Sequence, residues 1–122
     1  MRILILEDDS HRVNTFIEGL HRHSLTITEC SYDAIDHLER TVFDYLYLDH
    51  DLGEGNGVGT DVTSYLRAHP ENPNNNAQIV IHSWNIPAAS NMLKDLPQAV
   101  WAVFNSEEFF ASLNGAGQPA PH

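Results

Sequence analysis

Three short clusters of polar side chains stand out, because each directly follows a short apolar run. The clusters are Glu7, Asp8 and Asp9; Asp49, His50 and Asp51; and His82, Ser83, Trp84 and Asn85. Carboxylate oxygens are the ligands that hard cations such as Mg²⁺ prefer. Histidine exchanges protons near neutral pH, and serine or asparagine can donate hydrogen bonds to an anion. These residue types predict an acidic pocket, centred on Asp49, that binds Mg²⁺ or another divalent cation.

The spacing within the clusters predicts which side chains share a side. Side chains alternate along an extended strand, so Asp49 and Asp51 should point the same way while His50 points away. By the same rule Ser83 should point away from His82. Carboxylates that converge raise one another's pKa unless a cation neutralises them. Any one of these residues could instead cap a helix, but three clusters at one edge of a sheet favour a site.

The rest of the chain supplies the elements that must position these clusters. Continuous apolar runs predict buried strands, alternation predicts an edge strand, and apolar residues at helical spacing predict a helix after each strand. The predicted strands cover residues 3–6, 25–28, 45–48, 79–81 and 100–104. The third helix should stop before Pro70, the fourth should open at Pro87 and the last should begin near Ser106. Residues 51–57 and 71–77 are predicted loops, the second a polar loop at the surface.

Five strands that alternate with five helices predict an α/β fold, a doubly wound five-stranded parallel sheet with helices on both faces. The flavodoxin-like strand order 2-1-3-4-5 is expected for five such units. In that order the first and third strands are neighbours, and ligands bind outside their carboxyl ends. The three polar clusters would meet there. We expect one domain over residues 1–113 and a flexible C-terminal tail over residues 114–122.

The charge of the chain restricts its partners. It has 122 residues, with 17 acidic against six basic side chains and a formal net charge of -11. Such a surface repels phosphate backbones, so an extended nucleic-acid surface is not expected, although a metal ion could still hold a small anion. No run approaches the roughly 20 apolar residues of a membrane helix. The single cysteine, Cys30, fits a reducing compartment, and we expect a cytoplasmic protein with no membrane contact.

The opening run of residues 3–9, the strand that ends in Asp49 and the serine at position 83 resemble response-regulator receiver domains. The resemblance covers residues 1 to about 113 and implies the flavodoxin-like receiver fold. It also implies that Glu7 and Asp8 bind Mg²⁺, that Asp49 accepts a phosphoryl group and that Asp51 adds its backbone carbonyl to the metal. Ser83 would contact the transferred group.

The chain departs from the receiver pattern after the fifth strand. Receivers place a lysine there, usually before a proline, and it pairs with the phosphoryl oxygens. Here the stretch reads Phe104-Asn105-Ser106, so Asn105 stands in that place. The single lysine, Lys94, lies on the preceding helix. Arg12, at the start of the first helix, is a candidate source of the cation.

Two longer motifs are similar to the cyclic-phosphate processing receiver family. They are Leu48-Asp49-His50-Asp51-Leu52-Gly53 and Ile81-His82-Ser83-Trp84-Asn85, with Asn91-Met92 downstream. This resemblance implies action on cyclic phosphate ends, as in RNA repair or nucleotide signalling. The expected partner is then a small phosphorylated ligand or a nucleotide end.

Opening a cyclic phosphodiester requires a metal, a nucleophile or activated water, and an acid for the leaving oxygen. The resemblance supplies candidates for each part: Asp8 and Asp49 for the metal, with Glu7 in support and Asp51 as a further ligand; His82 or His50 as acid or base; and Ser83 and Asn85 as hydrogen-bond donors to the phosphate. Asp49 could be the covalent nucleophile or a metal ligand, and the residues leave both open.

Three functions fit these residues. The first is a Mg²⁺-dependent phosphoesterase that processes cyclic phosphates or related phosphoryl groups. The second is a phosphoacceptor module for phosphorelay signalling, which acts by binding a protein partner. The third is a receiver-shaped adaptor that binds a metal or a partner and does no chemistry. The extra histidine and asparagine residues favour the first, whereas the acid pair and Asp49 also suit the second.

Overall fold

The computed structural model describes residues 1–117 and confirms the predicted fold class. Its parallel sheet has the strand order β2-β1-β3-β4-β5. The strands are β1 (Arg2–Leu6), β2 (Ser24–Thr28), β3 (Tyr45–Leu48), β4 (Gln78–Ile81) and β5 (Val100–Trp101). The chain reverses its direction across the sheet between β1 and β3, which are hydrogen-bonded neighbours. The carboxyl ends of these two strands therefore lie side by side.

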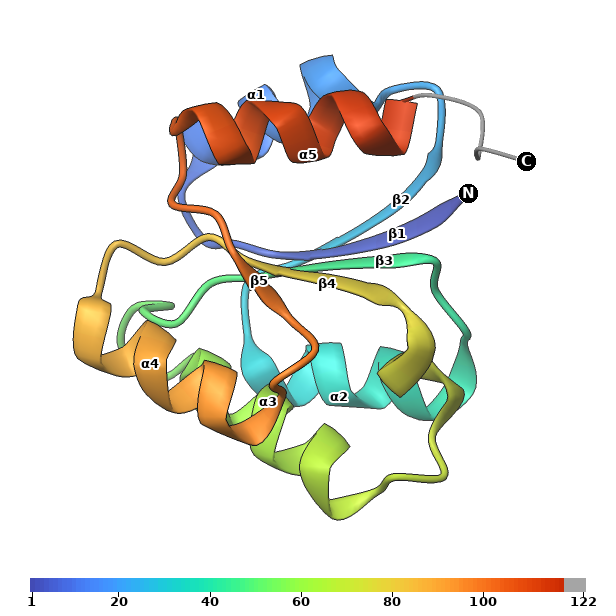
Figure 1. Cartoon of the computed structure of the whole chain (residues 1–122), viewed down its shortest axis with the longest axis vertical. Helices are drawn as coiled ribbons and strands as arrows, with labels where there is room; N and C mark the ends of the chain where they lie inside the picture. Colours follow the sequence, from blue (N-terminus) through green and yellow to red (C-terminus); the bar gives the residue numbers. More distant parts are fainter. Residues whose placement is uncertain (118–122) are drawn as a thin grey trace.

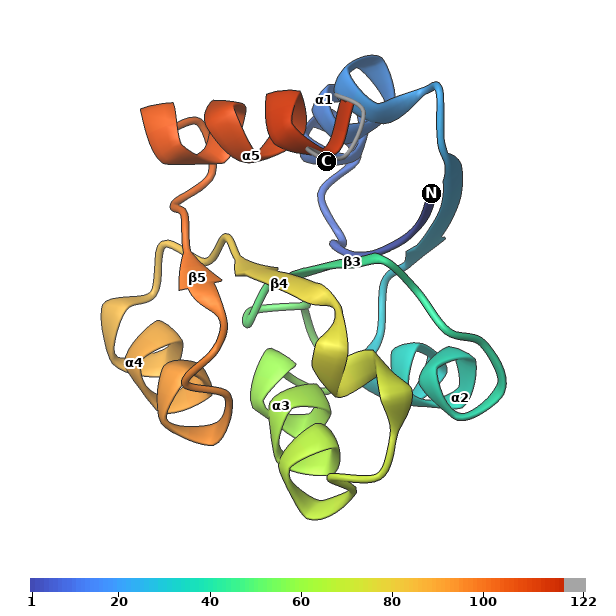
Figure 2. The same ribbon diagram turned by 45° about the vertical axis from the view of Figure 1, so that its right-hand side comes forward.

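Helices cover both faces of the sheet (Figures 1 and 2). One face carries α1 (Ser10–Leu20) and α5 (Glu107–Gly117), and the other carries α2 (Ser31–Arg40), α3 (Gly59–Ala68) and α4 (Ile86–Asp95). Asp9 caps α1 by accepting hydrogen bonds from the amides of His11 and Arg12. Asn85 caps α4 through the amide of Ala88. Two helices thus begin inside the polar clusters, which fixes the clusters against the sheet.

The central strands are buried on both faces, which explains their continuous apolar sequences. Along β1, Ile3 and Ile5 pack with Phe16 of α1 in one layer. Leu4 and Leu6 point the other way and pack in the layer that contains residues of α2, α3 and α4. The direction of each side chain that follows a strand is therefore set by the alternation within it.

The predicted polar surface loop at residues 71–77 needs correction. It contains a 3₁₀ turn, η1 (Pro73–Asn76), and Asn74 is fully buried. The Asn74 amide donates to the carbonyl groups of Leu38 and Thr41, and its Oδ1 accepts from the amide of Phe43. These bonds tie the end of α2 to the start of β3. A polar side chain can be buried when its hydrogen bonds are satisfied in this way.

The last strand is shorter than predicted, and the last helix continues past the predicted domain boundary at residue 113. β5 ends at Trp101 rather than at residue 104, although the amides of Ala102 and Phe104 still donate to carbonyl groups of Ile81 and His82. Helix α5 extends to Gly117, past residue 113, and residues 118–122 of the predicted tail lie outside the described residues. Within residues 1–117, no helix combines the length and apolar character that crossing a membrane requires.

Candidate functional site

The register of the sheet brings three polar residues into one row. β1, β3 and β4 are in register at Leu6, Leu48 and Ile81. The next residues along the chain are Glu7, Asp49 and His82, and all three are buried. Each offers a ligand atom within 4.8 Å of the other two. The row is therefore a compact, buried polar cluster at the carboxyl edge of the sheet.

Glu7 and His82 form a buried hydrogen-bonded pair within this row. His82 Nε2 lies 3.1 Å from Glu7 Oε1, and both side chains are 0% exposed. The second carboxylate oxygen of Glu7 accepts hydrogen bonds from the amides of Asp8 and Asp9. Burial acts to raise the pKa of Glu7, but the hydrogen bond and charge of His82, the amide of Asp9 and the charge of Arg12 together outweigh burial and hold that pKa below its ordinary value. Both Glu7 oxygens are thus engaged inside the protein.

Asp49 belongs to the buried row and also lines a pocket. Its Oδ1 accepts a hydrogen bond from the amide of His50 at 2.8 Å. Burial raises the pKa of Asp49 from 3.8 to about 6, the charge of Glu7 adds to this effect, and His82 and Arg12 oppose it. A carboxylate that is destabilised in this way gains from a nearby cation.

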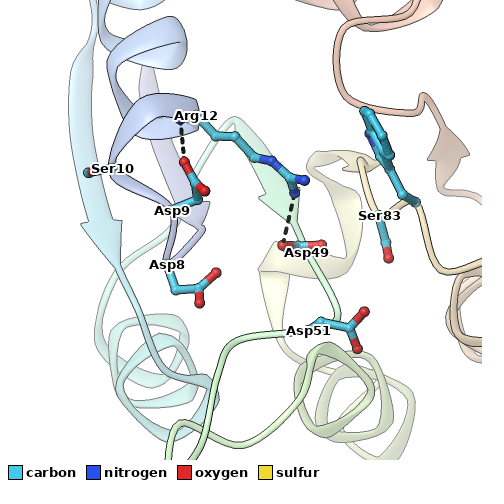
Figure 3. Close-up of a pocket in the computed structure, with 8 residues that line it drawn as sticks. Asp8, Asp9, Ser10, Arg12, Asp49, Asp51 and Ser83 are labelled. Atoms are coloured by element: carbon cyan, nitrogen blue, oxygen red, sulfur yellow. Dashed lines mark hydrogen bonds and ion pairs between the residues drawn. The ribbon is translucent and has the colours of Figure 1, made fainter.

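The pocket has a volume of about 480 Å³ and opens at the carboxyl edge of the sheet (Figure 3). Its lining residues are Asp8, Asp9, Ser10, Arg12, Asp49, Asp51, Ser83 and Trp84. In Figure 3 the carboxylates of Asp8, Asp49 and Asp51 lie around a shared space. Burial also raises the pKa of Asp8. Oxygen donors from three carboxylates fit the preference of a hard divalent cation, so these residues could hold Mg²⁺.

Arg12 reaches from α1 into this pocket toward Asp49 (Figure 3). Its Nη1 lies 3.8 Å from Asp49 Oδ2 and 3.8 Å from Glu7 Oε1. The guanidinium carbon lies 5.5 Å from the ring centroid of Trp84 and 5.2 Å from that of Phe104. Asn105, which follows Phe104, is exposed and has a φ of 69°. The pocket therefore takes its cationic side chain from α1 rather than from the segment after β5.

His50 and Asn85 contact the pocket through Asp51. His50 Nδ1 lies 2.9 Å from Asp51 Oδ1. The Asn85 amide donates to both carboxylate oxygens of Asp51, at 3.4 and 3.3 Å. The hydrogen bond from His50 is the main reason that the pKa of Asp51 lies below its ordinary value. These two residues therefore keep Asp51 ionised and oriented at the side of the pocket.

Ser83 lines the pocket on the side of β4 and is 1% exposed. Its Oγ accepts a hydrogen bond from the amide of Asn85 at 3.1 Å, and its carbonyl accepts one from Trp101 Nε1 at 2.9 Å. Neither bond uses the hydroxyl hydrogen. The Ser83 hydroxyl is therefore held in place with a hydrogen that it can donate to a ligand.

The loop between β3 and α3, which carries Asp51, is shaped by glycine. Gly53, Gly55 and Gly57 have φ values of 82°, 82° and 73°. A Cβ atom at Gly57 would collide with Oγ of Ser31, which itself donates to the carboxylate of Asp61. A Cβ atom at Gly55 would meet nothing within 4 Å. The two glycines therefore share a backbone conformation but differ in their surroundings.

Gly57→Ala is expected to lower the free energy of unfolding by about 2 to 4 kcal/mol, because it combines backbone strain with a collision. Gly55→Ala is the matched control and should cost only the backbone strain, about 1 to 2 kcal/mol. Urea unfolding followed by circular dichroism measures both. Equal losses of stability in the two variants would show that the collision with Ser31 adds no cost at Gly57.

The structure separates the predicted site residues into three groups. Asp8, Asp49, Asp51 and Ser83 line the pocket; Glu7 and His82 form the buried pair; His50 and Asn85 contact Asp51. Asp51 lines the pocket, and the expectation that its backbone carbonyl binds the metal stays a prediction. The sequence does not predict Trp84 as a site residue, and it offers Arg12 only as a candidate for the positive charge that the receiver lysine would supply. Two features of the sequence could have indicated them. Arg12 lies in the first turn of the helix that follows the acidic cluster, and Trp84 is an aromatic residue within a polar motif.

Comparisons with known proteins agree with the fold and identify a family. Residues 3–98 match the cyclic-phosphate processing receiver domain family. Similar solved structures include the phosphorylated cyanobacterial phytochrome response regulator RcpA, with 16% identity, a TM-score of 0.73 and coverage of 93% of this chain and 89% of that chain. A CheY-like receiver domain protein from Methanospirillum hungatei has 17% identity, a TM-score of 0.70 and 95% coverage of both chains.

The response regulator TrrA from Thermotoga maritima, in complex with Mg²⁺-BeF, has 17% identity, a TM-score of 0.70 and coverage of 94% of this chain and 97% of that chain. At these identities the likeness establishes the fold. Curated protein sequences gave no match.

Proposed function

Because the chain belongs to the cyclic-phosphate processing receiver domain family, we propose that its pocket binds a divalent cation and opens cyclic phosphates or related phosphoesters. The observation that carries this proposal is the pocket that Asp8, Asp49, Asp51 and Ser83 line together with Arg12. Carboxylates for a cation, with a hydroxyl and a guanidinium for phosphoryl oxygens, are the groups that phosphoryl chemistry requires. The complex of the Thermotoga maritima relative with Mg²⁺-BeF supports the choice of cation.

Asp8, Asp49 and Asp51 would hold the cation. When bound, it would neutralise charge on the phosphoryl oxygens and make the phosphorus easier to attack. Glu7 would support these ligands from the buried row, because it accepts hydrogen bonds from the amides of Asp8 and Asp9 and so fixes the segment that carries Asp8.

The reaction is the addition of one water molecule to the cyclic ester. The water oxygen bonds to phosphorus, and the bond from phosphorus to one ring oxygen breaks. The attacking water gives one proton to a pocket carboxylate, and the ring oxygen, which leaves with the electron pair, takes up that proton from the carboxylate. The product is a phosphomonoester with a free hydroxyl. Ser83 would donate its hydroxyl hydrogen to a phosphoryl oxygen and so orient the ester.

His82, His50 and Asn85 would act through their neighbours. His82 is fully buried and bonded to Glu7, so its role would be to hold the buried row rather than to touch the ester. His50 and Asn85 both contact Asp51, so they would set the position of one cation ligand. They are proposed as positioning residues.

The test is the turnover of a 2′,3′-cyclic-phosphate nucleotide with Mg²⁺ and with a chelator. We expect ring opening that requires the cation. Ser83→Ala is expected to lower kcat by about 10- to 100-fold, because one hydrogen bond to a charged group is lost. Ser90→Ala, at an exposed position of α4, is the matched control and should retain full activity. No turnover by the wild type with any of several cyclic phosphates would refute this function.

A second function is favoured by the position of Asp49, whose Oδ2 lies beside the Arg12 guanidinium in the pocket. In this function Asp49 is a phosphoacceptor, and the module signals by binding a protein partner. An Asp49 oxygen bonds to the phosphorus of a donor, the bond between phosphorus and the donor breaks, and the donor leaves with the electron pair. Incubation with acetyl phosphate and Mg²⁺ should then add the mass of one phosphoryl group. Labelling without turnover would select this function over the first.

A further inference from the structure

The acidic side chains that line the pocket repel a phosphorylated ligand, and one bound divalent cation is not enough to offset their charge. Four of the lining residues are carboxylates, Asp8, Asp9, Asp49 and Asp51, and Arg12 is the cationic side chain among those that line it. A phosphoryl group adds further negative charge. A single divalent cation leaves this set of charges negative. A group that attracts the phosphoryl oxygens is therefore needed in addition to the metal.

We propose that Arg12 binds the phosphoryl oxygens of the ligand, and that Trp84 and Phe104 hold its guanidinium in place for this purpose. This inference rests on the proposed phosphoryl function of the pocket and assigns one of its binding groups. Arginine suits the task because its planar guanidinium presents several donors to the oxygens of a phosphate.

The donors of Arg12 are not committed to partners within residues 1–117. Its Nη1 lies 3.8 Å from both Glu7 Oε1 and Asp49 Oδ2, which is beyond hydrogen-bonding distance. These carboxylates attract the guanidinium without consuming its donors. The Arg12 side chain is 29% exposed, so a ligand in the pocket can reach it. The group is charged, positioned and able to donate.

Aromatic rings restrict where the guanidinium can lie. The ring centroids of Trp84 and Phe104 are 5.5 and 5.2 Å from its central carbon, distances at which a cation and an aromatic ring attract each other. Trp84 is 60% exposed, and its Nε1 tethers the ring by donating to the carbonyl of Phe104 at 3.1 Å. Holding Arg12 in advance reduces the entropy that is lost when a ligand binds.

The simplest alternative is that Arg12 only neutralises Glu7 and Asp49. The two roles predict different patterns of binding. If Arg12 only neutralises the carboxylates, its loss should strengthen Mg²⁺ binding and should not specifically weaken the binding of an anion. If Arg12 binds phosphoryl oxygens, its loss should strengthen Mg²⁺ binding and weaken anion binding in the same variant.

The experiment compares wild type with Arg12→Met, Arg12→Lys and the control Arg40→Met, which removes an exposed arginine that pairs with Asp36 on α2. Calorimetric titration measures the affinity for Mg²⁺ alone, and then for beryllofluoride, a phosphoryl mimic, in the presence of saturating Mg²⁺. Arg12→Met should bind Mg²⁺ about 2- to 10-fold more tightly and beryllofluoride about 10- to 100-fold more weakly. Arg12→Lys should recover part of the beryllofluoride affinity, and Arg40→Met should match wild type.

Trp84→Leu tests the holding role without changing any charge. It should weaken beryllofluoride binding by about 3- to 10-fold and change Mg²⁺ affinity by less than Arg12→Met does. Undiminished beryllofluoride affinity in a folded Arg12→Met variant would overturn the inference while the cation site stands. A wild type that binds neither Mg²⁺ nor beryllofluoride would overturn the proposed function together with this inference.

Discussion

Asp49→Asn should abolish the Mg²⁺-dependent chemistry of the pocket and at the same time make the metal-free protein more stable. The loss of function follows because Asp49 is shared by the buried row and the pocket, and an amide cannot replace its charge toward a cation or act as a nucleophile. The gain in stability follows because burial and the charge of Glu7 disfavour the Asp49 carboxylate. We expect the free energy of unfolding to rise by about 1 to 3 kcal/mol at neutral pH.

The gain should depend on pH in one direction. The folded-state pKa of Asp49, about 6, lies above the ordinary value of 3.8, so between these values the folded protein binds a proton that the unfolded chain does not. Wild type therefore loses stability relative to Asp49→Asn as the pH rises from about 4 to about 7, and the difference is constant above that. Urea unfolding in the presence of a chelator, at several pH values, measures it.

Added Mg²⁺ supplies the control for this prediction. It should stabilise wild type in a thermal unfolding experiment and should have little effect on Asp49→Asn, because binding to the folded state alone raises stability. The same variant should give no turnover of cyclic phosphate and no phosphoryl labelling. A variant that is less stable than wild type at every pH, or that retains turnover, would contradict the assignment of Asp49.

The second large effect is expected at the buried pair of Glu7 and His82. His82→Leu leaves the Glu7 carboxylate buried without its histidine and should lower the free energy of unfolding by about 3 to 5 kcal/mol. The variant also loses the edge-on contact between His82 and Phe16. Because the hydrogen bond and charge of His82 hold the pKa of Glu7 low, the penalty falls on the ionised form of Glu7.

A double variant separates the pair from general packing. Glu7→Leu combined with His82→Leu should recover about 2 kcal/mol or more relative to the sum of the single variants, because no unpaired charge remains. His37→Leu is the control, since His37 forms a partly exposed pair with Asp33 on α2 and should change stability by less than about 0.5 kcal/mol. Additive effects in the double variant would show that Glu7 and His82 do not depend on each other.

The sequence by itself determined the fold and, to a large extent, which residues line the pocket. Continuous apolar runs specify strands that are buried on both faces, and the alternation of strands and helices leads to the order that the structure has. Asp8, Asp49, Asp51 and Ser83 were predictable as neighbours, because each follows a strand and parallel strands end at the same edge. These are consequences of local pattern and of the small number of ways in which such units can pack.

The tertiary structure decided which of these side chains face the pocket and which are buried against one another. The sequence predicts Glu7 and His82 as residues of the acidic pocket, but the register of β1 and β4 and the layer under α1 bury them and turn them toward each other. Asn74 likewise is buried because its side-chain amide satisfies three backbone groups of residues 38–43, a stretch distant from it in the sequence. Such contacts join residues that lie more than 30 positions apart, so no local pattern contains them.

The position of Arg12 is a further result of tertiary packing. A long side chain at the start of a helix can lie in solvent or along several neighbours, and the sequence does not choose among them. In the folded protein Trp84, from the segment after β4, and Phe104, from the segment after β5, lie on its path and direct the guanidinium toward Asp49. The sequence therefore determined the acidic character of the pocket, whereas packing between distant segments decided where its positive charge lies.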